Sequence, residues 1–252
     1  MPMIRFLYLL LFSIAFALPL HAQSLRLFGI DDSGYPVMKA KFTAFDATWT
    51  QQSPSIPSLF LTENGIPRTI TNVQCPPPQT PAVVSLAMSI DISSSMHSTV
   101  EWAKNTVAEL CSLTVFPMSD FALQTCDDRA LIVQDFTKDK TKITDALPGI
   151  VAEGGNDFTE HLLHRVTGLL NVAKNGTNKR IAVLFTDAWW FQLTPAELLE
   201  CKRICDSNKI QFIAVIYSRP ETEPNGIKLS LRELASHTGG MMYDGVYSKE
   251  DA

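Results

Sequence analysis

The chain has 252 residues, of which 46% are apolar and 19% are charged, which is typical of a globular protein with one large domain and one small module. Its net charge at pH 7 is −5, which argues against a nucleic-acid partner, because proteins that bind phosphate backbones present basic surfaces. Its five cysteines permit up to two disulfides if the chain is exported.

Residues 1–22 have the pattern of a secretory signal peptide. Arg5 precedes an apolar run at residues 6–20, and the small residue Ala22 stands before the predicted cleavage site. The run has only 15 residues and contains Pro19, so a membrane-spanning helix is the weaker interpretation. No later apolar stretch reaches the ~20 residues that such a helix needs. We therefore predict a secreted, periplasmic or cell-surface protein without a membrane span after signal removal.

The next part, residues 23–75, is predicted to be a small β module, with an immunoglobulin-like fold as one option. Asn64-Gly65 lies between two extended runs and is a strong hairpin signal. A module of this length has a marginal core, so we expect it to be stabilised by packing against the next domain. Its β-favouring segments are residues 24–30, 37–45, 59–62 and 66–73.

A proline-rich linker at residues 76–81 is predicted to separate this module from the main domain, because consecutive prolines favour an extended conformation. Strands and helices then alternate over residues 82–247. This alternation predicts an α/β fold with a doubly wound, mostly parallel sheet and helices on both faces. The expected strands, several of them near-continuous apolar runs, are residues 83–90, 121–125, 130–136, 180–185, 210–217 and 241–243.

Helical patterns lie between these strands. Thr194 is expected to cap a helix with Pro195 at its first position, and Gly239 marks the end of a last helix from about Leu229. Apolar residues recur at helical spacing at Val100, Ala103, Val107 and Leu110, and again at Leu162, Leu163, Val166, Leu169 and Leu170. We interpret Cys201 and Cys205, one helical turn apart, as a half-buried pair rather than a metal site.

Two strand ends carry acidic residues. Asp91 ends the first buried strand and is followed by Ser93 and Ser95, while Asp187 follows a later strand. In a doubly wound sheet, side chains at the carboxyl ends of neighbouring central strands converge where the strand order reverses. A carboxylate and two hydroxyls present hard oxygens that suit Mg²⁺ or Mn²⁺. Two carboxylates this close would repel each other, so a cation is their natural partner.

The Asp-x-Ser-x-Ser stretch at Asp91, the later Gly-Gly loop and the strand that ends in Thr-Asp resemble the metal-ion-dependent adhesion site of von Willebrand factor A domains, which integrins share. The resemblance covers nearly all of residues 82–247. It implies that Ser93 and Ser95 bind Mg²⁺ directly, with Mn²⁺ or Ca²⁺ as alternatives. Asp91 and Asp187 would hold the cation largely through water. A carboxylate of a protein partner would complete the coordination.

The chain departs from the family pattern in the loop after Gly154-Gly155. The family's threonine most often stands where this chain has Asn156, whose carbonyl can still supply an oxygen, and Thr159 or Asp157 could instead turn inward. Ser94 and Ala188 replace glycines that are common in the family.

The family also has a further helix after the last predicted strand. Residues 248–252 are therefore interpreted as a tail, either of a truncated chain or of part of a longer product.

Other residues near the site have alternative interpretations. Trp189 and Trp190 directly follow Asp187, so one of them is expected to contact a partner, or else to fold its ring onto the core. His161 and His164 lack the spacing of a zinc peptidase motif, and we interpret them as surface histidines.

Taken together, these patterns predict an exported adhesion or protein-interaction module, not an enzyme, which binds an acidic group through a divalent cation. Two alternatives stay open. A metal-free scaffold of the cell envelope is favoured by Asn156. A Mg²⁺-dependent hydrolase would use Asp91, but no Lys or Arg lies close in sequence to act on a phosphate.

Overall fold

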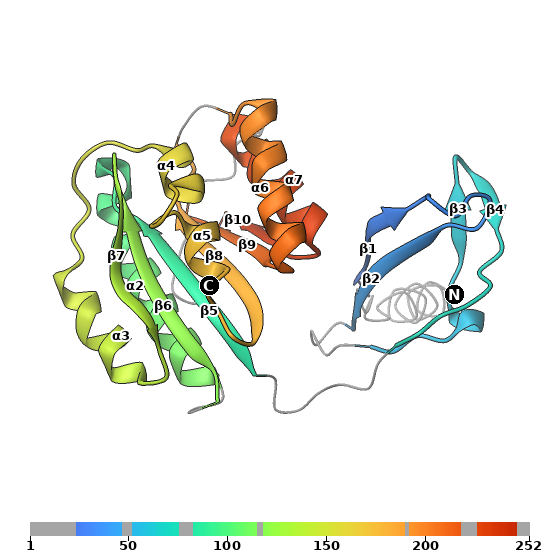
Figure 1. The fold of residues 1–252 in the computed structure, drawn as a ribbon, viewed down its shortest axis with the longest axis horizontal. Helices are drawn as coiled ribbons and strands as arrows, with labels where there is room; N and C mark the ends of the chain where they lie inside the picture. The colour runs from blue at the N-terminus through green and yellow to red at the C-terminus, as the bar shows by residue number, and fades with distance from the viewer. Residues whose placement is uncertain are drawn as a thin grey trace, which may run out of the picture. The chain divides into compact units, whose positions relative to one another are not determined.

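A computed structural model describes residues 24–46, 52–75, 83–114, 118–189, 192–217 and 226–245 (Figure 1). The chain divides into two compact units, residues 1–27 with 42–77 and residues 28–41 with 78–252. The predicted signal peptide at 1–22, linker at 76–81 and tail at 248–252 lie outside the described residues. The boundaries expected for the β module and the main domain stay predictions.

The N-terminal part contains two small strand pairs. β1 (Ser24–Asp31) pairs with β2 (Lys39–Phe45), and β3 (Leu61–Glu63) pairs antiparallel with β4 (Ile66–Arg68). A short 3-10 helix, Ile56–Ser58, precedes the second pair. Asn64 and Gly65 join β3 to β4 with φ of 52° and 79°, the left-handed conformations of the predicted hairpin turn. Ala44 alone is buried among the described residues of 24–75.

Six strands form the main sheet in the order β10-β9-β8-β5-β6-β7. All neighbours are parallel except β6 and β7, which a short turn joins into an antiparallel pair. This confirms the predicted mostly parallel, doubly wound sheet. The strands are β5 (Val84–Asp91), β6 (Asp120–Cys126), β7 (Ala130–Thr137), β8 (Lys179–Thr186), β9 (Gln211–Ile216) and β10 (Met242–Asp244).

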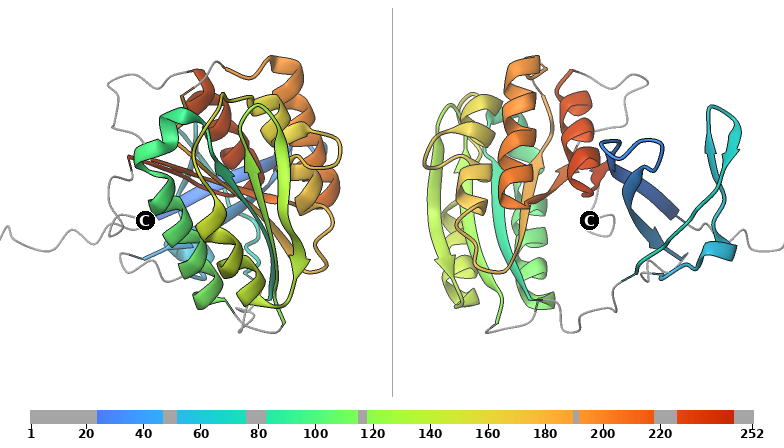
Figure 2. Two further views of the ribbon diagram at one scale, coloured as in Figure 1. Left: turned by 90° about the vertical axis from the view of Figure 1, so that its left-hand side faces the viewer. Right: turned by 45° about the vertical axis from the view of Figure 1, so that its right-hand side comes forward.

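Helices cover both faces of this sheet (Figure 2). One face packs against α2 (Val100–Leu113) and α3 (Lys140–Ala146), with short 3-10 helices at Ser94–Ser98 and Leu147–Gly149. The other face packs against α4 (Phe158–Leu163), α5 (Leu169–Ala173), α6 (Pro195–Asn208) and α7 (Gly226–Thr238).

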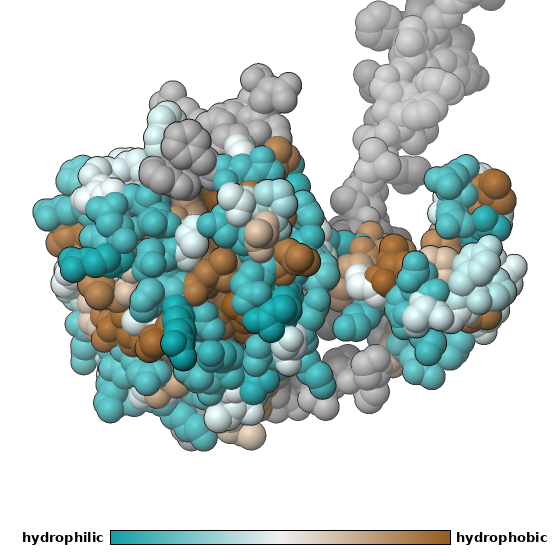
Figure 3. Space-filling view, turned by 45° about the horizontal axis from the view of Figure 1, so that its top comes forward, coloured by the Kyte–Doolittle hydropathy of each residue, from teal (hydrophilic) through white to brown (hydrophobic). Residues whose placement is uncertain are grey.

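The two apolar cores follow from strand alternation. In β5, Leu86 and Met88 point to the α2 side while Ala87 between them points to the α4–α7 side. β8 alternates in the same way, with Val183 and Leu184 on opposite faces. Because the apolar stripes of the helices turn inward, the surface in Figure 3 is mainly hydrophilic with scattered apolar side chains.

One break between two helices was not predicted from the sequence. Leu162 to Leu170 suggested a single helical face, but α4 ends at Leu163, α5 begins at Leu169, and Val166 between them is 64% exposed. A Cβ at Gly168 would lie 2.5 Å from the backbone nitrogen of His164, so the tight turn requires glycine there. The predicted continuous face is therefore wrong.

The helix ends agree better with the sequence. Thr194 caps α6, and Glu197 returns a hydrogen bond to the Thr194 backbone, which is a capping box. The last helix ends at Thr238 as expected but begins at Gly226, three residues before Leu229. No helix within the described ranges has the length and apolar character that crossing a bilayer requires.

All five cysteines are free in the structure. Cys201 and Cys205 both face the core from α6, with exposures of 0% and 1%. They were expected to be half-buried, and that prediction is wrong because α6 packs against α4, α5 and α7 and both cysteines belong to the apolar core on this face of the sheet.

Candidate functional site

The candidate site lies at the carboxyl ends of β5 and β8 (Figure 1), which are adjacent and parallel. Ile90 pairs with Phe185, so Asp91 and Thr186 follow one another in register at the same edge of the sheet. From β5 the chain adds β6 on one side, and from β8 it adds β9 and β10 on the other. This is the point where strand order reverses, and where ligands of doubly wound sheets bind.

Asp91 is fully buried and accepts three hydrogen bonds. Its Oδ1 accepts from the backbone N–H of Ser93 at 2.9 Å. Its Oδ2 accepts from the Thr186 hydroxyl at 2.6 Å and from Asn156 Nδ2 at 2.9 Å. Burial raises the pKa of Asp91 to about 6, and hydrogen bonds from Thr186 and Ser93 act in the opposite direction.

The two serines expected as ligands stand side by side. Ser93 Oγ and Ser95 Oγ are 3.1 Å apart and share a hydrogen bond. Ser93 is 3% exposed, whereas Ser95 is exposed to solvent. The hydroxyl pair therefore reaches from the buried carboxylate of Asp91 to the surface.

A second loop is tied to this segment from both sides. The Ser94 backbone N–H and hydroxyl both donate to the carbonyl of Gly154, at 3.1 and 2.7 Å. The Glu153 N–H donates to the Ile92 carbonyl at 2.7 Å. Gly154 has φ +103°, a conformation that favours glycine. The serine at position 94 thus fixes the position of the loop that carries Asn156.

Asn156 is the loop residue that contacts Asp91. It is 7% exposed, and its Nδ2 donates to Asp91 Oδ2. Its Oδ1 is buried and has no hydrogen-bond partner among the described residues. A buried acceptor without a partner costs about 1–3 kcal/mol, so this oxygen is available to a ligand.

The structure does not bring Thr159 or Asp157 to Asp91. The Thr159 hydroxyl donates to Glu197 Oε1 in α6 at 2.8 Å. The Asp157 carboxylate caps α4 by accepting from the backbone N–H groups of Thr159 and Glu160. Of the three loop residues considered from sequence, Asn156 is the one in contact with the buried carboxylate.

Asp187 directly follows β8 and is half-buried. Its Oδ1 accepts from the Trp189 backbone N–H at 3.2 Å. Ala188 between them is buried with φ 56°, a left-handed conformation that is unfavourable for alanine and favours glycine. Trp189 is 70% exposed, and Trp190 lies outside the described residues.

Sequence reasoning did not assign Thr186, whose hydroxyl bridges the two loops. It donates to Asp91 and accepts from the Ala188 N–H at 2.9 Å. A signal was present, because a polar residue at the end of an apolar parallel strand faces the same crevice as its neighbours.

His161 is fully buried, so the prediction that it is a surface histidine is wrong. Its Nε2 lies 2.6 Å from the hydroxyl of Ser89 in β5. Burial lowers the pKa of His161 to about 3, so the imidazole is neutral at pH 7. Phe158 and Leu162, three residues before and one after, are both in the core and place this side of α4 against the sheet.

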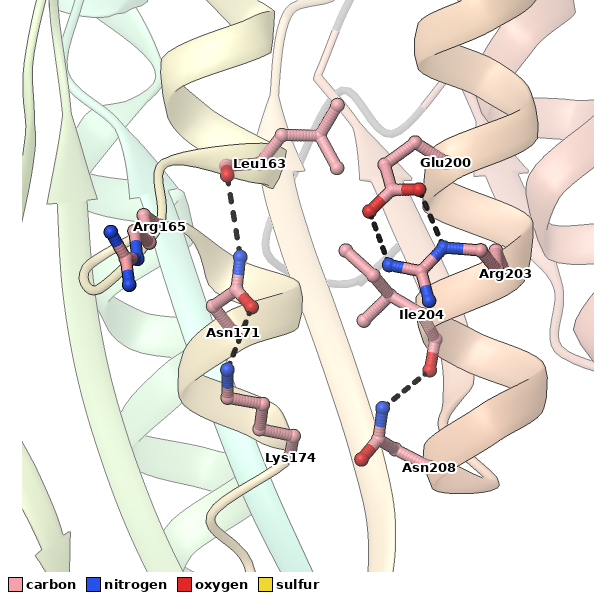
Figure 4. Close-up of a pocket in the computed structure, with 8 residues that line it drawn as sticks. All are labelled: Leu163, Arg165, Asn171, Lys174, Glu200, Arg203, Ile204 and Asn208. Atoms are coloured by element: carbon pink, nitrogen blue, oxygen red, sulfur yellow. Dashed lines mark hydrogen bonds and ion pairs between the residues drawn. The ribbon is translucent and has the colours of Figure 1, made fainter.

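A described hollow lies elsewhere, between α5 and α6 (Figure 4). Arg203 in this hollow is paired with Glu200 through two 2.6 Å hydrogen bonds, and Lys174 donates to the amide oxygen of Asn171. None of the candidate ligands lines it, so we do not assign it to the site. Its lining residues are Leu163, Arg165, Asn171, Lys174, Glu200, Arg203, Ile204 and Asn208.

The donors at the Asp91 site are oxygens from two carboxylates, two hydroxyls and one amide. Within the described residues no group of three or more His, Cys, Asp or Glu side chains is placed to hold a metal. The site therefore differs from zinc sites built of nitrogen and sulfur, and its oxygens fit hard cations such as Mg²⁺ and Ca²⁺.

Comparisons with known proteins point to one family for part of the chain. Residues 86–189 match the family model of the von Willebrand factor type A domain, a segment that includes both acids and the Gly-Gly loop. This part of the chain is thus similar to a von Willebrand factor type A domain. A domains of this family are mainly protein-interaction modules rather than enzymes. A search of curated proteins gave no match.

Solved structures show the same A-domain fold. Proximal thread matrix protein 1 from the mussel byssus has a TM-score of 0.52 at 17% identity, over 67% of this chain and 43% of that one. The same mussel protein with a zinc-occupied MIDAS motif has a TM-score of 0.51 at 15% identity, over 67% and 42%. The SpRpn10 VWA domain has a TM-score of 0.50 at 13% identity, over 65% and 88%. This chain thus spans less than half of the mussel protein's length.

Proposed function

We propose that this protein is an exported interaction or adhesion module whose A domain binds an acidic group of a partner protein through a divalent cation. The observation that carries the proposal is the unpaired, buried Oδ1 of Asn156 beside Asp91. Together with the Ser93–Ser95 hydroxyl pair, it gives three neutral oxygen donors next to a buried carboxylate. The mussel protein structure with a zinc-occupied MIDAS motif supports the proposal that the corresponding site of this chain binds a cation.

In this proposal Ser93, Ser95 and Asn156 bind the cation directly, and Asp91 and Asp187 hold it through water. The cation supplies positive charge, which its neutral ligands leave largely uncompensated, and a partner's carboxylate is attracted to it. Asp91 stays fixed by its three hydrogen bonds, so the site needs little rearrangement.

Trp189 is proposed as an anchor for the partner. Its ring is 70% exposed directly after Asp187, and buried tryptophans dominate the binding energy of many interfaces. Trp190, which also remains a candidate contact, lies outside the described residues.

Cation titration tests the proposal. Isothermal titration calorimetry with Mg²⁺, Mn²⁺ and Ca²⁺ should show binding to the wild type. A Ser93→Ala/Ser95→Ala variant should bind more than about 100-fold more weakly, since loss of even an outer-shell partner costs roughly 10–100-fold. Ser98→Ala, an exposed serine in the same segment, is the matched control and should bind like the wild type. Equal affinities of the double variant and the wild type would contradict the proposal.

One observation favours the metal-free scaffold as a second candidate. Asp91 already accepts three hydrogen bonds from protein donors, so its buried charge is stabilised without a cation. The two candidates differ in their response to EDTA. Partner capture should be lost in chelator if the cation carries the contact, and should persist if the domain acts as a scaffold.

Export is a separate part of the proposal and rests on the signal-like pattern of residues 1–22. The mature protein, purified after expression in a host with a secretory pathway, should begin at Gln23. An intact N-terminus in the cytosolic fraction would contradict export.

A further inference from the structure

Asn156 distinguishes this site from one built of hydroxyls alone, because its amide group has both a donor and an acceptor at the site. Its Nδ2 donates to Asp91 Oδ2 at 2.9 Å, while its Oδ1 is buried without a partner among the described residues. The nitrogen and the oxygen share one planar amide group. Fixing the nitrogen on Asp91 therefore also fixes where the carbonyl oxygen lies.

The surroundings of Asn156 leave the amide little freedom to move. Asp91 is held by Ser93 and Thr186 in addition to Asn156. The loop that carries Asn156 is tied down by the two hydrogen bonds from Ser94 to Gly154. An incoming cation must therefore accept the carbonyl oxygen where it stands, unless the hydrogen bond to Asp91 breaks.

Mg²⁺ and Ca²⁺ differ in their tolerance of such a fixed ligand. Mg²⁺ demands near-ideal octahedral geometry with oxygens at about 2.0–2.1 Å, whereas Ca²⁺ accepts six to eight oxygens at about 2.3–2.6 Å in irregular arrangements. Amide carbonyls are common Ca²⁺ ligands. A fixed carbonyl therefore penalises the smaller cation more than the larger one.

The exposed side of the site fits the larger cation as well. Ser95 is exposed and Asp187 is half-buried, so water can enter beside the hydroxyl pair and fill additional coordination positions. Two carboxylates close to neutral oxygens also supply the charge that a Ca²⁺ site of moderate affinity uses.

We propose that Asn156 makes this site selective for Ca²⁺ over Mg²⁺. The inference rests on the proposed cation site and goes beyond it by naming the cation and the residue that selects it. Asn156 acts through the position of its carbonyl oxygen, which the hydrogen bond to Asp91 sets.

Titration of the full chain with Ca²⁺ and with Mg²⁺ separately, followed by calorimetry and by intrinsic tryptophan fluorescence, tests the inference. The wild type should bind Ca²⁺ at least about tenfold more tightly than Mg²⁺, a difference of about 1.4 kcal/mol. Asn156→Thr, which restores a hydroxyl, should reduce this preference about tenfold. Asn175→Thr makes the same change at an exposed loop position outside the site and should leave the preference unchanged.

Asn156→Ala keeps the test decisive if the threonine variant does not fold, as judged by circular dichroism. Loss of the carbonyl should weaken Ca²⁺ binding about tenfold more than it weakens Mg²⁺ binding. A wild type that binds Mg²⁺ as tightly as Ca²⁺ would overturn the inference. So would a Ca²⁺ preference that both Asn156 variants retain.

These outcomes are distinct from a failure of the proposed function. If neither cation nor Mn²⁺ binds the wild type, the cation site itself is wrong, and the selectivity inference falls with it. If cations bind but selectivity does not depend on Asn156, the proposed function stands and the inference alone is overturned.

Discussion

Two buried aspartates occupy opposite ends of neighbouring strands, and their surroundings differ. Asp91 lies at the carboxyl end of β5, and Asp120 lies at the amino end of β6. Asp120 accepts hydrogen bonds from Ser85 Oγ, Asn178 Nδ2 and Thr177 Oγ1, and the Asn178 N–H donates in turn to Ser85 Oγ. This network is closed on itself and ties the loop before β8 to the sheet.

Asp91 also accepts three hydrogen bonds, but the groups around it are not all satisfied. Asn156 presents a buried oxygen without a partner, and Ser95 next to Ser93 is open to solvent. The comparison teaches that a buried, hydrogen-bonded aspartate does not by itself indicate function. The additional oxygen acceptors beside Asp91 distinguish a binding site from the purely structural hydrogen-bond network of Asp120.

The largest expected effect on stability is that of a substitution at Asp120, at the amino end of β6. Asp120→Ala should lower the free energy of unfolding by about 3 kcal/mol, because it leaves the buried Ser85 hydroxyl without its acceptor and removes the contacts to Thr177 and Asn178. Cation affinity should not change. Urea denaturation provides the measurement, and Asp145→Ala, at an exposed aspartate of α3, is the control that should change stability by less than about 0.5 kcal/mol. A loss of cation binding in Asp120→Ala would contradict the expectation that the Asp120 network and the cation site are independent.

The buried histidine between the two ends gives the next largest effect. The pKa of His161 falls to about 3 in the folded state, so below its ordinary value of 6.5 the unfolded chain binds more protons than the folded one. Its contribution to stability is present above pH 6.5 and is lost as the pH falls towards 3. The difference in unfolding free energy between wild type and His161→Gln should shrink by about 2 kcal/mol from pH 7 to pH 5.

Denaturation of both proteins across this pH range, in the presence of EDTA, measures that difference and cancels the contributions of all other groups. A difference that stays constant with pH would show that His161 titrates normally in the folded state. The burial of its ring against Ser89 would then not have the effect that we infer from the structure.

A smaller change in stability is expected at the functional end. Asp91→Asn removes a buried charge that costs desolvation, but its NH2 group cannot accept the hydrogen bonds that a carboxylate oxygen accepts, so the two effects oppose each other. The free energy of unfolding in EDTA should therefore change by less than about 1 kcal/mol, while cation binding is lost. Denaturation and calorimetry on the same samples check both expectations. Destabilisation as large as that of Asp120→Ala would show that Asp91, like Asp120, mainly stabilises the fold.

The smallest expected effect on stability is that of Trp189→Ala. Because the ring is 70% exposed, its removal should change the free energy of unfolding by less than about 0.5 kcal/mol. Partner affinity should fall at least about tenfold if the ring is an anchor. Surface plasmon resonance with the captured partner measures that loss, and unchanged affinity would remove Trp189 from the proposed interface.

Sequence patterns predicted the sheet better than they predicted the contacts around it. Several strands are near-continuous apolar runs, which predict buried strands, and Asp91 and Asp187 are recognisable because each stands at the end of a mainly apolar strand. The break between α4 and α5 was missed, because Leu162 to Leu170 keep helical spacing across a turn that depends on Gly168.

Polar contacts between distant segments were harder to predict. The pairing of Asn156 with Asp91 depends on how Ser94 ties the loop at Gly154, and no spacing in the sequence reveals that bond. The burial of His161 had a signal, since Phe158 and Leu162 flank it on the core side of α4. Thr159 turned towards Glu197 because the capping box of α6 brings that glutamate near the end of the loop.

An anomalous difference map from crystals soaked in Mn²⁺ tests the central claim most directly, because it locates the cation without reference to affinity. We predict one strong peak at the carboxyl ends of β5 and β8, within about 2.6 Å of the Ser93 and Ser95 hydroxyl oxygens and of Asn156 Oδ1. Crystals soaked in Mn²⁺ that show no peak there, with Asn156 still donating to Asp91, would contradict the account.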